Sequence, residues 1–491
     1  YVINGANSNT GNLTIDTATV HVNAGKTLLG YNAGWIGRSV TLQNGGVLEA
    51  YDYANNGLWG GPSSGIGDGA ANIIFGSGGG TFSMLGTTMD SGVNKGFTIN
   101  SGSTGHFHVP TGTSATWSGS YSGRDFTVNS TGTLDFNGGG NFTTSRLVSG
   151  SGNVTKSDAG TLTLQSVNSF SGSLTVNGGT LVASAATSSG TNSGTGNGSA
   201  TNVITVNSGA TLKYTGSRGA GYHQANANIN GGTITMDAAD QSFAVGKTVK
   251  FDTAAGTING SGQWRFRGGA TAQVTAAATG STISVATLDL YDGTQTFNIE
   301  TGAVLTVSSQ LTRDGGGVFA KSGGGTLVLS GNSSAYTGAS SVSAGTLLVT
   351  GSLGGSVTVA SSATVGGTGT VGGNLSMASG SFFDIFLALS NPLDVGGTVT
   401  FATGFGIDNL LNNGAAVDWS TISDNTYTLI AGTVNTANLD NLGLANAYDI
   451  GGGRKAYFQS GSLQLVVVPE PTSALLLGLG AFAISLRRRR A

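Results

Sequence analysis

Two histidines, His106 and His108, are the residues of this chain whose spacing most directly suggests metal chemistry. Side chains two residues apart on a β-strand point to the same face, so the two imidazoles could bind a transition metal together. The sequence has no aspartate or glutamate close to them that would serve as a third ligand. We therefore expect ordinary exposed strand residues here, and we predict neither a metal site nor another cofactor.

Carboxylates and arginines that could serve polysaccharide chemistry occur in several short groups. These groups are Glu49 with Asp52, Asp237 with Asp240, Arg265 with Arg267, Asp289 with Asp292, and Arg313 with Asp314. Glycoside hydrolysis needs two carboxyl groups about 5–9 Å apart, and a lyase would need several aspartates with an arginine or lysine on one face. The sequence alone places no two of these groups together, and aspartate in turns is the ordinary explanation. We predict no catalytic residues and no enzyme; a polysaccharide lyase or hydrolase is the alternative.

Several aromatic residues, most of them near the N-terminal end, could contact sugars. The set consists of Trp35, Tyr51, Tyr53, Trp59, Trp117 and Tyr121. Sugar rings stack on exposed aromatic faces, but aromatic rings also fill the space beneath loops. Both interpretations stay open, and extracellular polysaccharide is a candidate partner.

The composition favours strands and turns over helices. The chain has 491 residues, of which 86 are glycine; 9% are charged and 38% are hydrophobic. This glycine content disfavours helices, and this apolar content disfavours disorder. The net charge of −3 indicates no nucleic-acid partner, and the absence of cysteine excludes disulfides and thiolate metal sites.

One short phrase recurs along the chain and predicts the elements that must position these groups. It consists of an apolar residue, a small polar turn with glycine or serine, and a β-branched or apolar strand start, as in Val206–Leu212, Ile229–Ile234, Val342–Leu347 and Val359–Val365. Asparagine and glycine accept a positive φ, so each copy predicts a strand end, a tight turn and a new strand. Several neighbouring copies lie roughly 16 to 30 residues apart, about one coil of a β-solenoid, in which each coil buries its inward side chains against a neighbour.

Hairpins in sandwiches or propeller blades are the alternative, since Asn-Gly also marks hairpins. Irregular spacing and short strands such as Thr161–Leu164 favour the solenoid. We predict an all-β fold: a parallel, right-handed β-helix with a β-rich C-terminal cap and a short C-terminal hydrophobic helix. At ~4.8 Å per coil, roughly 20 coils would form a rod on the order of 100 Å long.

Two longer segments, 150–184 and 317–351, repeat more faithfully. Their shared residues are Lys156, Gly160, Phe170, Gly172 and Gly179 in the first segment, and Lys321, Gly325, Tyr336, Gly338 and Gly345 in the second. This pattern resembles the autotransporter-associated β-strand repeat, although Asp158 stands where that pattern has glycine. The resemblance implies a right-handed β-helix of a bacterial surface protein and makes these ten residues the repeat signature.

The last residues combine a rigid break, an apolar segment and a cationic end. They are Pro469, Glu470 and Pro471, then the apolar run Ala474–Leu486, then Arg487, Arg488, Arg489 and Arg490. At ~1.5 Å per residue the apolar run gives roughly 20 Å of helix, which is short for a ~30 Å hydrocarbon core. Such a span suits a transient anchor, and the four arginines would keep the C-terminus in the cytoplasm.

This order of parts resembles the PEP-CTERM sorting signal of exosortase-processed proteins. The resemblance implies that an exosortase-type membrane protease recognises the chain near Pro469–Pro471. It also implies a signal peptide before Tyr1, and release to the cell surface or extracellular matrix of a Gram-negative-type bacterium.

The predicted organisation has four parts: N-terminal coils over 1–148, a solenoid with both repeats over 149–381, a β-rich cap over 382–468 and the sorting signal over 469–491. We predict an exported structural or adhesive surface protein. The alternative is a polysaccharide-acting enzyme on the same scaffold. An autotransporter passenger is a third interpretation, which the arginine-rich end disfavours.

Overall fold

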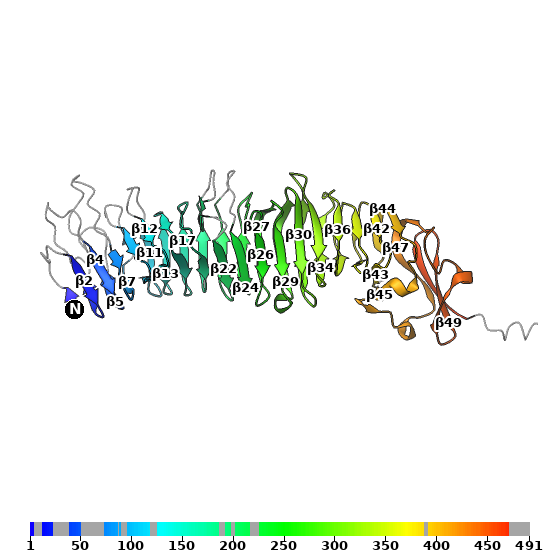
Figure 1. Ribbon diagram of the computed structural model, residues 1–491, viewed down its shortest axis with the longest axis horizontal. Helices are drawn as coiled ribbons and strands as arrows, with labels where there is room; N and C mark the ends of the chain where they lie inside the picture. Colours follow the sequence, from blue (N-terminus) through cyan, green and yellow to red (C-terminus); the bar gives the residue numbers. More distant parts are fainter. Residues whose placement is uncertain are drawn as a thin grey trace, which may run out of the picture. The chain divides into compact units, whose positions relative to one another are not determined.

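The computed structural model of the chain describes residues 1–3, 12–22, 39–50, 73–86, 88–89, 96–117, 125–185, 192–197, 202–216, 225–386 and 391–470. The chain divides into two compact units, residues 1–317 and residues 318–491. Within the described ranges the secondary structure consists of β-strands and short 3-10 helices, without an α-helix (Figure 1). The predicted all-β fold is confirmed.

The first unit is a parallel β-solenoid whose wall consists of three sheets. The first sheet contains β1 (Val2–Ile3), β3 (Thr19–Val22), β5 (Gly46–Ala50), β7 (Gly80–Met84), β10 (Thr104–His108), β13 (Thr133–Asn137), β16 (Asn153–Lys156), β18 (Leu174–Val176), β22 (Val203–Asn207), β24 (Asn226–Asn230), β26 (Thr248–Phe251), β28 (Thr271–Val274) and β30 (Thr294–Ile299). The second sheet contains β8 (Thr88–Met89), β11 (Ser114–Trp117), β14 (Asn141–Thr144), β17 (Thr161–Leu164), β19 (Thr180–Ala183), β23 (Thr211–Tyr214), β25 (Thr233–Met236), β27 (Thr257–Phe266), β29 (Ser281–Leu290), β31 (Val304–Val307) and β32 (Gln310–Thr312). The third sheet contains β2 (Leu13–Asp16), β4 (Val40–Gln43), β6 (Ile73–Phe75), β9 (Phe97–Ile99), β12 (Phe126–Val128) and β15 (Val148–Gly150). A small antiparallel pair, β20 (Asn192–Ser193) with β21 (Gly196–Asn197), and the 3-10 helix η1 (Ala276–Ala278) lie between wall strands.

The strand register shows that the recurring phrase marks one coil. Val206 in β22 pairs in parallel with Ile229 in β24, so two predicted copies stack directly. Leu162, Leu181 and Leu212 share one register column of the second sheet and are at most 1% exposed. A threonine precedes each of them at the outward position. Since each coil buries its inward side chains and pairs with the next, the predicted solenoid is confirmed.

Aromatic rings fill the interior of the N-terminal coils. Phe97 packs against Phe82, Trp117 and Phe126, with ring centroids 5.2 Å apart in each pair. All four side chains are 0% exposed. Such pairs add about 0.5–1.5 kcal/mol each beyond the area that they bury. The aromatic core therefore stabilises the part of the solenoid that has all three sheets.

The second unit also begins as parallel coils. One row of strands contains β33 (Val318–Ser322), β36 (Ser340–Val342), β39 (Val357–Val359), β42 (Leu375–Met377), β44 (Leu393–Phe401) and β47 (Asn425–Asn435). A second row contains β34 (Thr326–Leu329), β37 (Thr346–Val349), β40 (Thr364–Gly366), β43 (Phe382–Ile385) and β45 (Leu410–Asn412). A third row contains β35 (Asn332–Ser333), β38 (Ser352–Leu353) and β41 (Thr370–Val371). Val342 pairs with Val359, again from one copy of the phrase to the next.

Antiparallel strands close the second unit. They are β46 (Ala415–Ala416), β48 (Tyr448–Gly451), β49 (Arg454–Gln459) and β50 (Leu463–Pro469), with the 3-10 helices η3 (Ile407–Asn409), η4 (Trp419–Thr421) and η5 (Leu444–Asn446) in the connections. The parallel ladder continues past residue 382 through β43 and β44. Parallel coils and antiparallel strands therefore share the region that we predicted as the cap.

The described part of the chain ends at Glu470. Pro471, the expected hydrophobic helix Ala474–Leu486 and the arginines Arg487–Arg490 lie outside it. Among the described residues, no helix has the length and apolar character that crossing a membrane requires.

Candidate functional site

Each repeat segment buries its signature lysine against backbone carbonyl groups. Lys321 is 0% exposed, and its Nζ donates to the carbonyl oxygens of Ser322 at 2.8 Å, Gly323 at 2.7 Å and Ala344 at 3.1 Å. Ser322 is the last residue of β33 and Gly323 begins the turn that follows, whereas Ala344 lies in the corresponding turn of the next coil. The ammonium group therefore connects two stacked turns.

Lys156 makes two of these three contacts in the first repeat. It is 3% exposed, and its Nζ donates to the carbonyl oxygens of Asp158 and, at 3.4 Å, Gly178. Burial lowers the pKa of both lysines, that of Lys321 to about 8. The carbonyl dipoles compensate part of the lost hydration of each ammonium group.

The signature glycines let adjacent turns approach closely. Gly179 and Gly345 have φ values of +60° and +66°, and a Cβ at either position would lie 2.3 or 2.4 Å from a carbonyl oxygen of the preceding coil. A Cβ at Gly160 or Gly172 would lie 1.8 or 2.1 Å from such an oxygen. No side chain fits at that distance, so these positions require glycine.

The remaining signature residues fill or border the core. Phe170 and Tyr336 are 0% exposed. Gly338 leaves room for the Tyr336 ring, whose hydroxyl oxygen would lie 2.5 Å from a Cβ there. Gly325 provides one of the carbonyl oxygens that face Gly345. The structure thus gives the signature residues a role in stacking coils.

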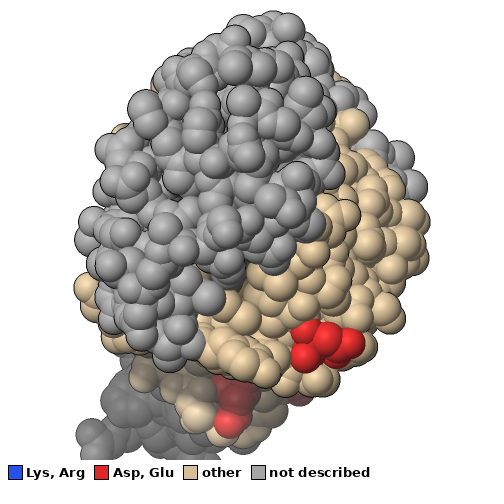
Figure 2. All heavy atoms as spheres, turned by 90° about the vertical axis from the view of Figure 1, so that its left-hand side faces the viewer, with Lys and Arg blue, Asp and Glu red and all other residues tan. Residues whose placement is uncertain are grey.

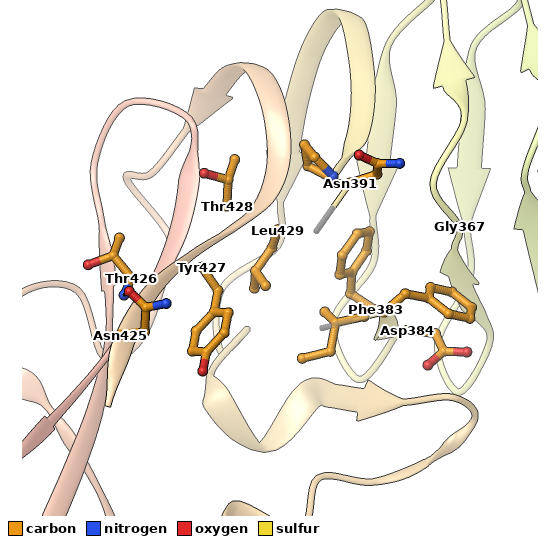
Figure 3. Close-up of a pocket in the computed structure, with 12 residues that line it drawn as sticks. Gly367, Phe383, Asp384, Asn391, Asn425, Thr426, Tyr427, Thr428 and Leu429 are labelled. Atoms are coloured by element: carbon orange, nitrogen blue, oxygen red, sulfur yellow. The ribbon is translucent and has the colours of Figure 1, made fainter. Parts of the chain in front are cut away.

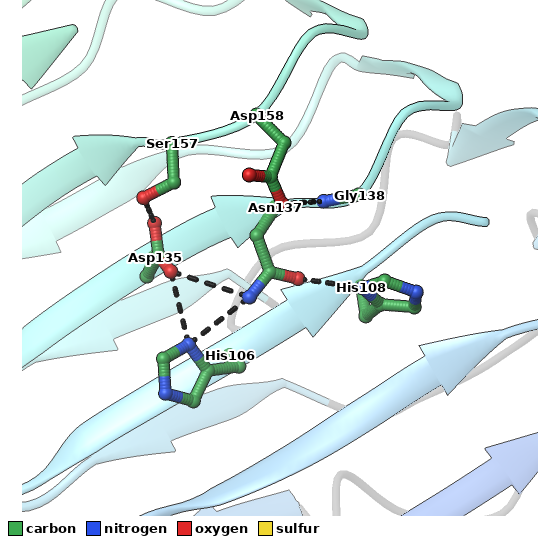
Figure 4. Close-up of polar contacts among 7 residues, drawn as sticks. All are labelled: His106, His108, Asp135, Asn137, Gly138, Ser157 and Asp158. Carbon is green, nitrogen blue, oxygen red and sulfur yellow. Dashed lines mark hydrogen bonds and ion pairs between the residues drawn. The ribbon is translucent and has the colours of Figure 1, made fainter. Parts of the chain in front are cut away.

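Polar residues of the next coil contact both histidines of the predicted pair. His106 Nδ1 lies 2.9 Å from Asp135 Oδ2, and His108 Nδ1 lies 2.8 Å from Asn137 Oδ1. Asn137 lies between the two rings (Figure 4). Our expectation of no carboxylate near these histidines is wrong, because Asp135 is 29 residues away in sequence but is the register partner of His106.

These groups form a hydrogen-bonded ladder on the outer face of the first sheet. Ser157 Oγ donates to Asp135 Oδ1 at 2.6 Å, and Gly138 N donates to Asp158 Oδ2 at 2.8 Å (Figure 4). In this ladder the serine contacts the aspartate and not the histidine, whereas nucleophilic catalysis needs a contact between nucleophile and base. No group of three or more possible metal ligands occurs among the described residues.

A second charged cluster converges on Arg265 in β27. Its Nη1 lies 3.0 Å from Asp240 Oδ1, its Nε 3.1 Å from Asp289 Oδ2 and its Nη2 3.6 Å from Asp314 Oδ2. The strands β27 and β29 have 10 residues each, so the second sheet widens here. This widening brings carboxylates from different coils around one guanidinium.

Tyr291 and a second arginine extend this cluster. The guanidinium carbons of Arg265 and Arg267 lie 4.7 and 4.3 Å from the Tyr291 ring centroid. Arg267 Nη2 also lies 3.4 Å from Asp292 Oδ2. The structure therefore brings together residues that the sequence showed only as four separate groups.

The Arg265 cluster has the geometry of a structural ion network. Asp289 has a side-chain exposure of 0%, and burial raises the pKa of its carboxyl group. A raised pKa suits a general acid, but a carboxyl group with no exposure cannot contact a polysaccharide. Arg265 compensates the buried charge, and Asp240 and Asp314 share the same guanidinium.

The other predicted residues lie apart from both clusters. Glu49 Oε2 lies 2.9 Å from His21 Nδ1, and Asp237 pairs with Lys213 at 2.7 Å. The hydrogen bond from Lys213 lowers the pKa of the Asp237 carboxyl. Trp117 is 0% exposed, so it offers no surface to a sugar. Trp35, Tyr51, Asp52, Tyr53, Trp59 and Tyr121 lie outside the described residues.

Figure 2 shows the end of the molecule at which β2 and β4 lie. The charged side chains that the described residues display on this face are acidic. The described residues on this face therefore offer no basic patch to a polyanion.

The first two residues of the sorting motif contact the antiparallel strands. Pro469 is the register partner of Arg454 at the end of β50. Glu470 N donates to the Gly453 carbonyl oxygen at 2.6 Å, and Glu470 Oε1 lies 3.2 Å from Lys455 Nζ. The motif therefore begins where the antiparallel sheet ends.

Comparison with known proteins supports both resemblances. The passenger-associated-transport-repeat model matches residues 154–183 and 319–349, and the PEP-CTERM protein-sorting motif matches residues 467–490. A stretch of 68 residues is 41% identical to the adhesin BmaC autotransporter of Brucella suis biovar 1 (strain 1330). This stretch is 14% of the present chain and 2% of that adhesin. No solved structure matches the chain.

Proposed function

We propose that this protein is an exported structural and adhesive protein of the cell surface or extracellular matrix of a Gram-negative bacterium. The passenger-type repeats and the sorting motif support export to the surface. The similarity to an autotransporter adhesin supports adhesion. An exosortase-type protease is the proposed processing partner. Before processing, the apolar segment Ala474–Leu486 would hold the chain in the membrane with its C-terminus in the cytoplasm.

A column of threonines on the outer face of the second sheet carries the adhesive part of this proposal. The seven register partners are Thr161, Thr180, Thr211, Thr233, Thr257, Thr282 and Thr306. Each threonine is partly exposed. Because adjacent strands lie ~4.8 Å apart, hydroxyl and methyl groups repeat along the wall at that interval.

Such a column favours attachment to a repeating polymer. Threonine hydroxyl groups are uncharged and can donate hydrogen bonds to sugar hydroxyl groups or accept them. Many weak contacts along one rigid wall together give strong binding. Extracellular polysaccharide is the partner that we propose for this wall.

Substitution of the column tests the adhesive role. The test variant replaces Thr211, Thr233 and Thr257 by valine, and the control variant replaces Thr155, Thr175 and Thr205 of the first sheet by valine. Valine keeps the strand propensity and removes the hydroxyl group. Binding of the purified chain to extracellular polysaccharide of the producing cells should fall in the test variant alone. Equal binding by both variants would contradict the role of the column.

A polysaccharide-acting enzyme is the second candidate, because charged groups converge on Arg265. The complete burial of Asp289 argues against it. Incubation of the purified chain with neutral and acidic polysaccharides decides between the two candidates. New reducing ends or unsaturated sugar products, lost on Asp314→Asn substitution, would establish the enzyme.

A further inference from the structure

The second unit contains a cavity of about 290 Å³, which is separate from the threonine column of the first unit. It lies between β43 and the first half of β47, with Phe383 on one side and Tyr427 and Leu429 on the other (Figure 3).

The cavity exists because β47 changes partners along its length. From Ile430 onward β47 pairs in parallel with β44, whereas its first half pairs antiparallel with β50. The register shifts between Thr428 and Ile430. The first half of β47 therefore leaves the parallel wall and opens a space beside the core-facing residues of β43.

Apolar side chains form the floor of the cavity, but most of its accessible surface is polar. Phe383, Ile385 and Leu429 are 1%, 2% and 3% exposed. Tyr427 is partly exposed, and its hydroxyl group donates to the Ser423 carbonyl oxygen at 2.9 Å, which holds the ring in place. The cavity thus offers the partly exposed Tyr427 ring to a ligand.

The described residues at the rim of the cavity are polar, and none of them is positively charged. Asn391, Asn425 and Thr428 are exposed at the rim. Of the described residues that line the cavity, Asp384 is the only acidic one and none is basic. Asp384 is 2% exposed and its Oδ1 accepts from Gly414 N at 2.9 Å. A phosphate or a uronate would therefore find no compensating cation among the described residues that line the cavity.

We propose that this cavity binds one neutral hexopyranose ring, with its C–H face on the Tyr427 ring and its hydroxyl groups on the amides and hydroxyl groups of the rim. Small-ligand pockets start at about 300 Å³, so this cavity suits a ligand of one ring.

Sugar binding in this cavity rests on the proposed adhesive function for its biological role. The cavity and the adhesive function can nevertheless be disproved independently. The threonine column lies in the first unit and the cavity in the second. If no sugar binds in the cavity, attachment through the threonine column is still possible. If the protein does not reach the cell surface, the purified chain can still bind a sugar in the cavity.

Saturation-transfer NMR on the purified full chain tests the cavity. The probes are methyl β-D-glucopyranoside, methyl β-D-galactopyranoside and methyl α-D-mannopyranoside, with D-glucuronate as the charged comparison. At least one neutral hexoside should bind with a dissociation constant in the millimolar range or tighter. Glucuronate should bind more weakly than that hexoside.

Two variants and one control locate the binding. Tyr427→Ala and Asn425→Ala should each weaken it, the former roughly tenfold. Tyr448→Ala removes a ring that is 40% exposed outside the cavity and should change nothing. Asn425 is exposed, so this variant keeps the test decisive if Tyr427→Ala does not fold. Absence of binding by every hexoside, undiminished binding in both cavity variants, or tighter binding of glucuronate would overturn the proposal.

Discussion

Lys321 Nζ donates a hydrogen bond to the carbonyl oxygen of Ala344, which lies 23 residues further along the chain. Lys156 and Gly178 repeat this contact across 22 residues in the first unit. In both cases the acceptor directly precedes a glycine with positive φ. In each passenger-type repeat a buried ammonium group therefore joins two turns of adjacent coils. Glycine allows these turns to approach closely because it has no side chain.

Replacement of Lys321 by methionine should lower the free energy of unfolding of the second unit by about 1–3 kcal/mol. The carbonyl groups of three residues lose their donor, although removal of the buried charge offsets part of the loss. Lys455→Met is the control, because Lys455 has a side-chain exposure of 31% in its ion pair with Glu470. Urea titration followed by circular dichroism measures both. Equal losses in the two variants would show that the buried contacts of Lys321 are unimportant.

The stability that depends on Lys321 should rise with pH above about 8. Burial lowers the pKa of Lys321 from 10.5 to about 8 in the folded chain. Between these pH values the unfolded chain binds more protons than the folded one, so the free energy of unfolding increases with pH, by about 3 kcal/mol at most. The difference between the native chain and Lys321→Met, measured from pH 7 to pH 10.5, isolates this effect. A difference that stays constant across this range would refute the shifted pKa.

Alanine at Gly179 should destabilise the first unit far more than alanine at Gly302. Both glycines have positive φ, of +60° and +82°. A Cβ at Gly302 would have open space, whereas one at Gly179 would lie 2.3 Å from a carbonyl oxygen. We expect a loss of about 1–2 kcal/mol for Gly302→Ala from the backbone conformation alone, and at least twice that for Gly179→Ala. Similar losses in thermal unfolding of the two variants would mean that the turns can separate easily.

Removal of Arg265 should leave a buried carboxylate without compensation. Arg265→Met should lower the free energy of unfolding of the first unit by about 3–5 kcal/mol. The double variant with Asp289→Asn should recover part of this loss, because the second change removes the buried charge. Asp314→Asn, at an aspartate with a side-chain exposure of 54%, is the control and should cost less than about 1 kcal/mol. No recovery in the double variant would contradict the ion network.

The coils could be predicted from the sequence because their signal is local. The phrase of apolar residue, turn and strand start occupies about seven residues, and its copies at Val206 and Ile229 are direct register partners. Burial of Trp117 could also have been predicted. In Ser114–Trp117, polar residues alternate with Ala115 and Trp117, and this alternation places the tryptophan on the inward side.

The histidine ladder and the Arg265 cluster could not be predicted, because they depend on the register between coils. His106 meets Asp135 across 29 residues, and Arg265 meets Asp289 across 24. Loops of different length separate these strands, so no fixed spacing in the sequence relates the partners. In the sequence Asp135 therefore stands apart from His106, and Asp289 is grouped with Asp292 and not with Arg265, although the structure brings each carboxylate to its partner.

Surface retention of the chain in an exosortase-containing Gram-negative host is the sharpest test of sorting through the C-terminal tail. Antibody labelling of intact cells would compare the full chain with a variant that lacks Pro469–Ala491. We expect antibody to label the cell surface or its matrix in cells with the full chain, and we expect the truncated variant to lose this labelling while its synthesis continues. Equal surface labelling of the two chains would contradict sorting through the tail.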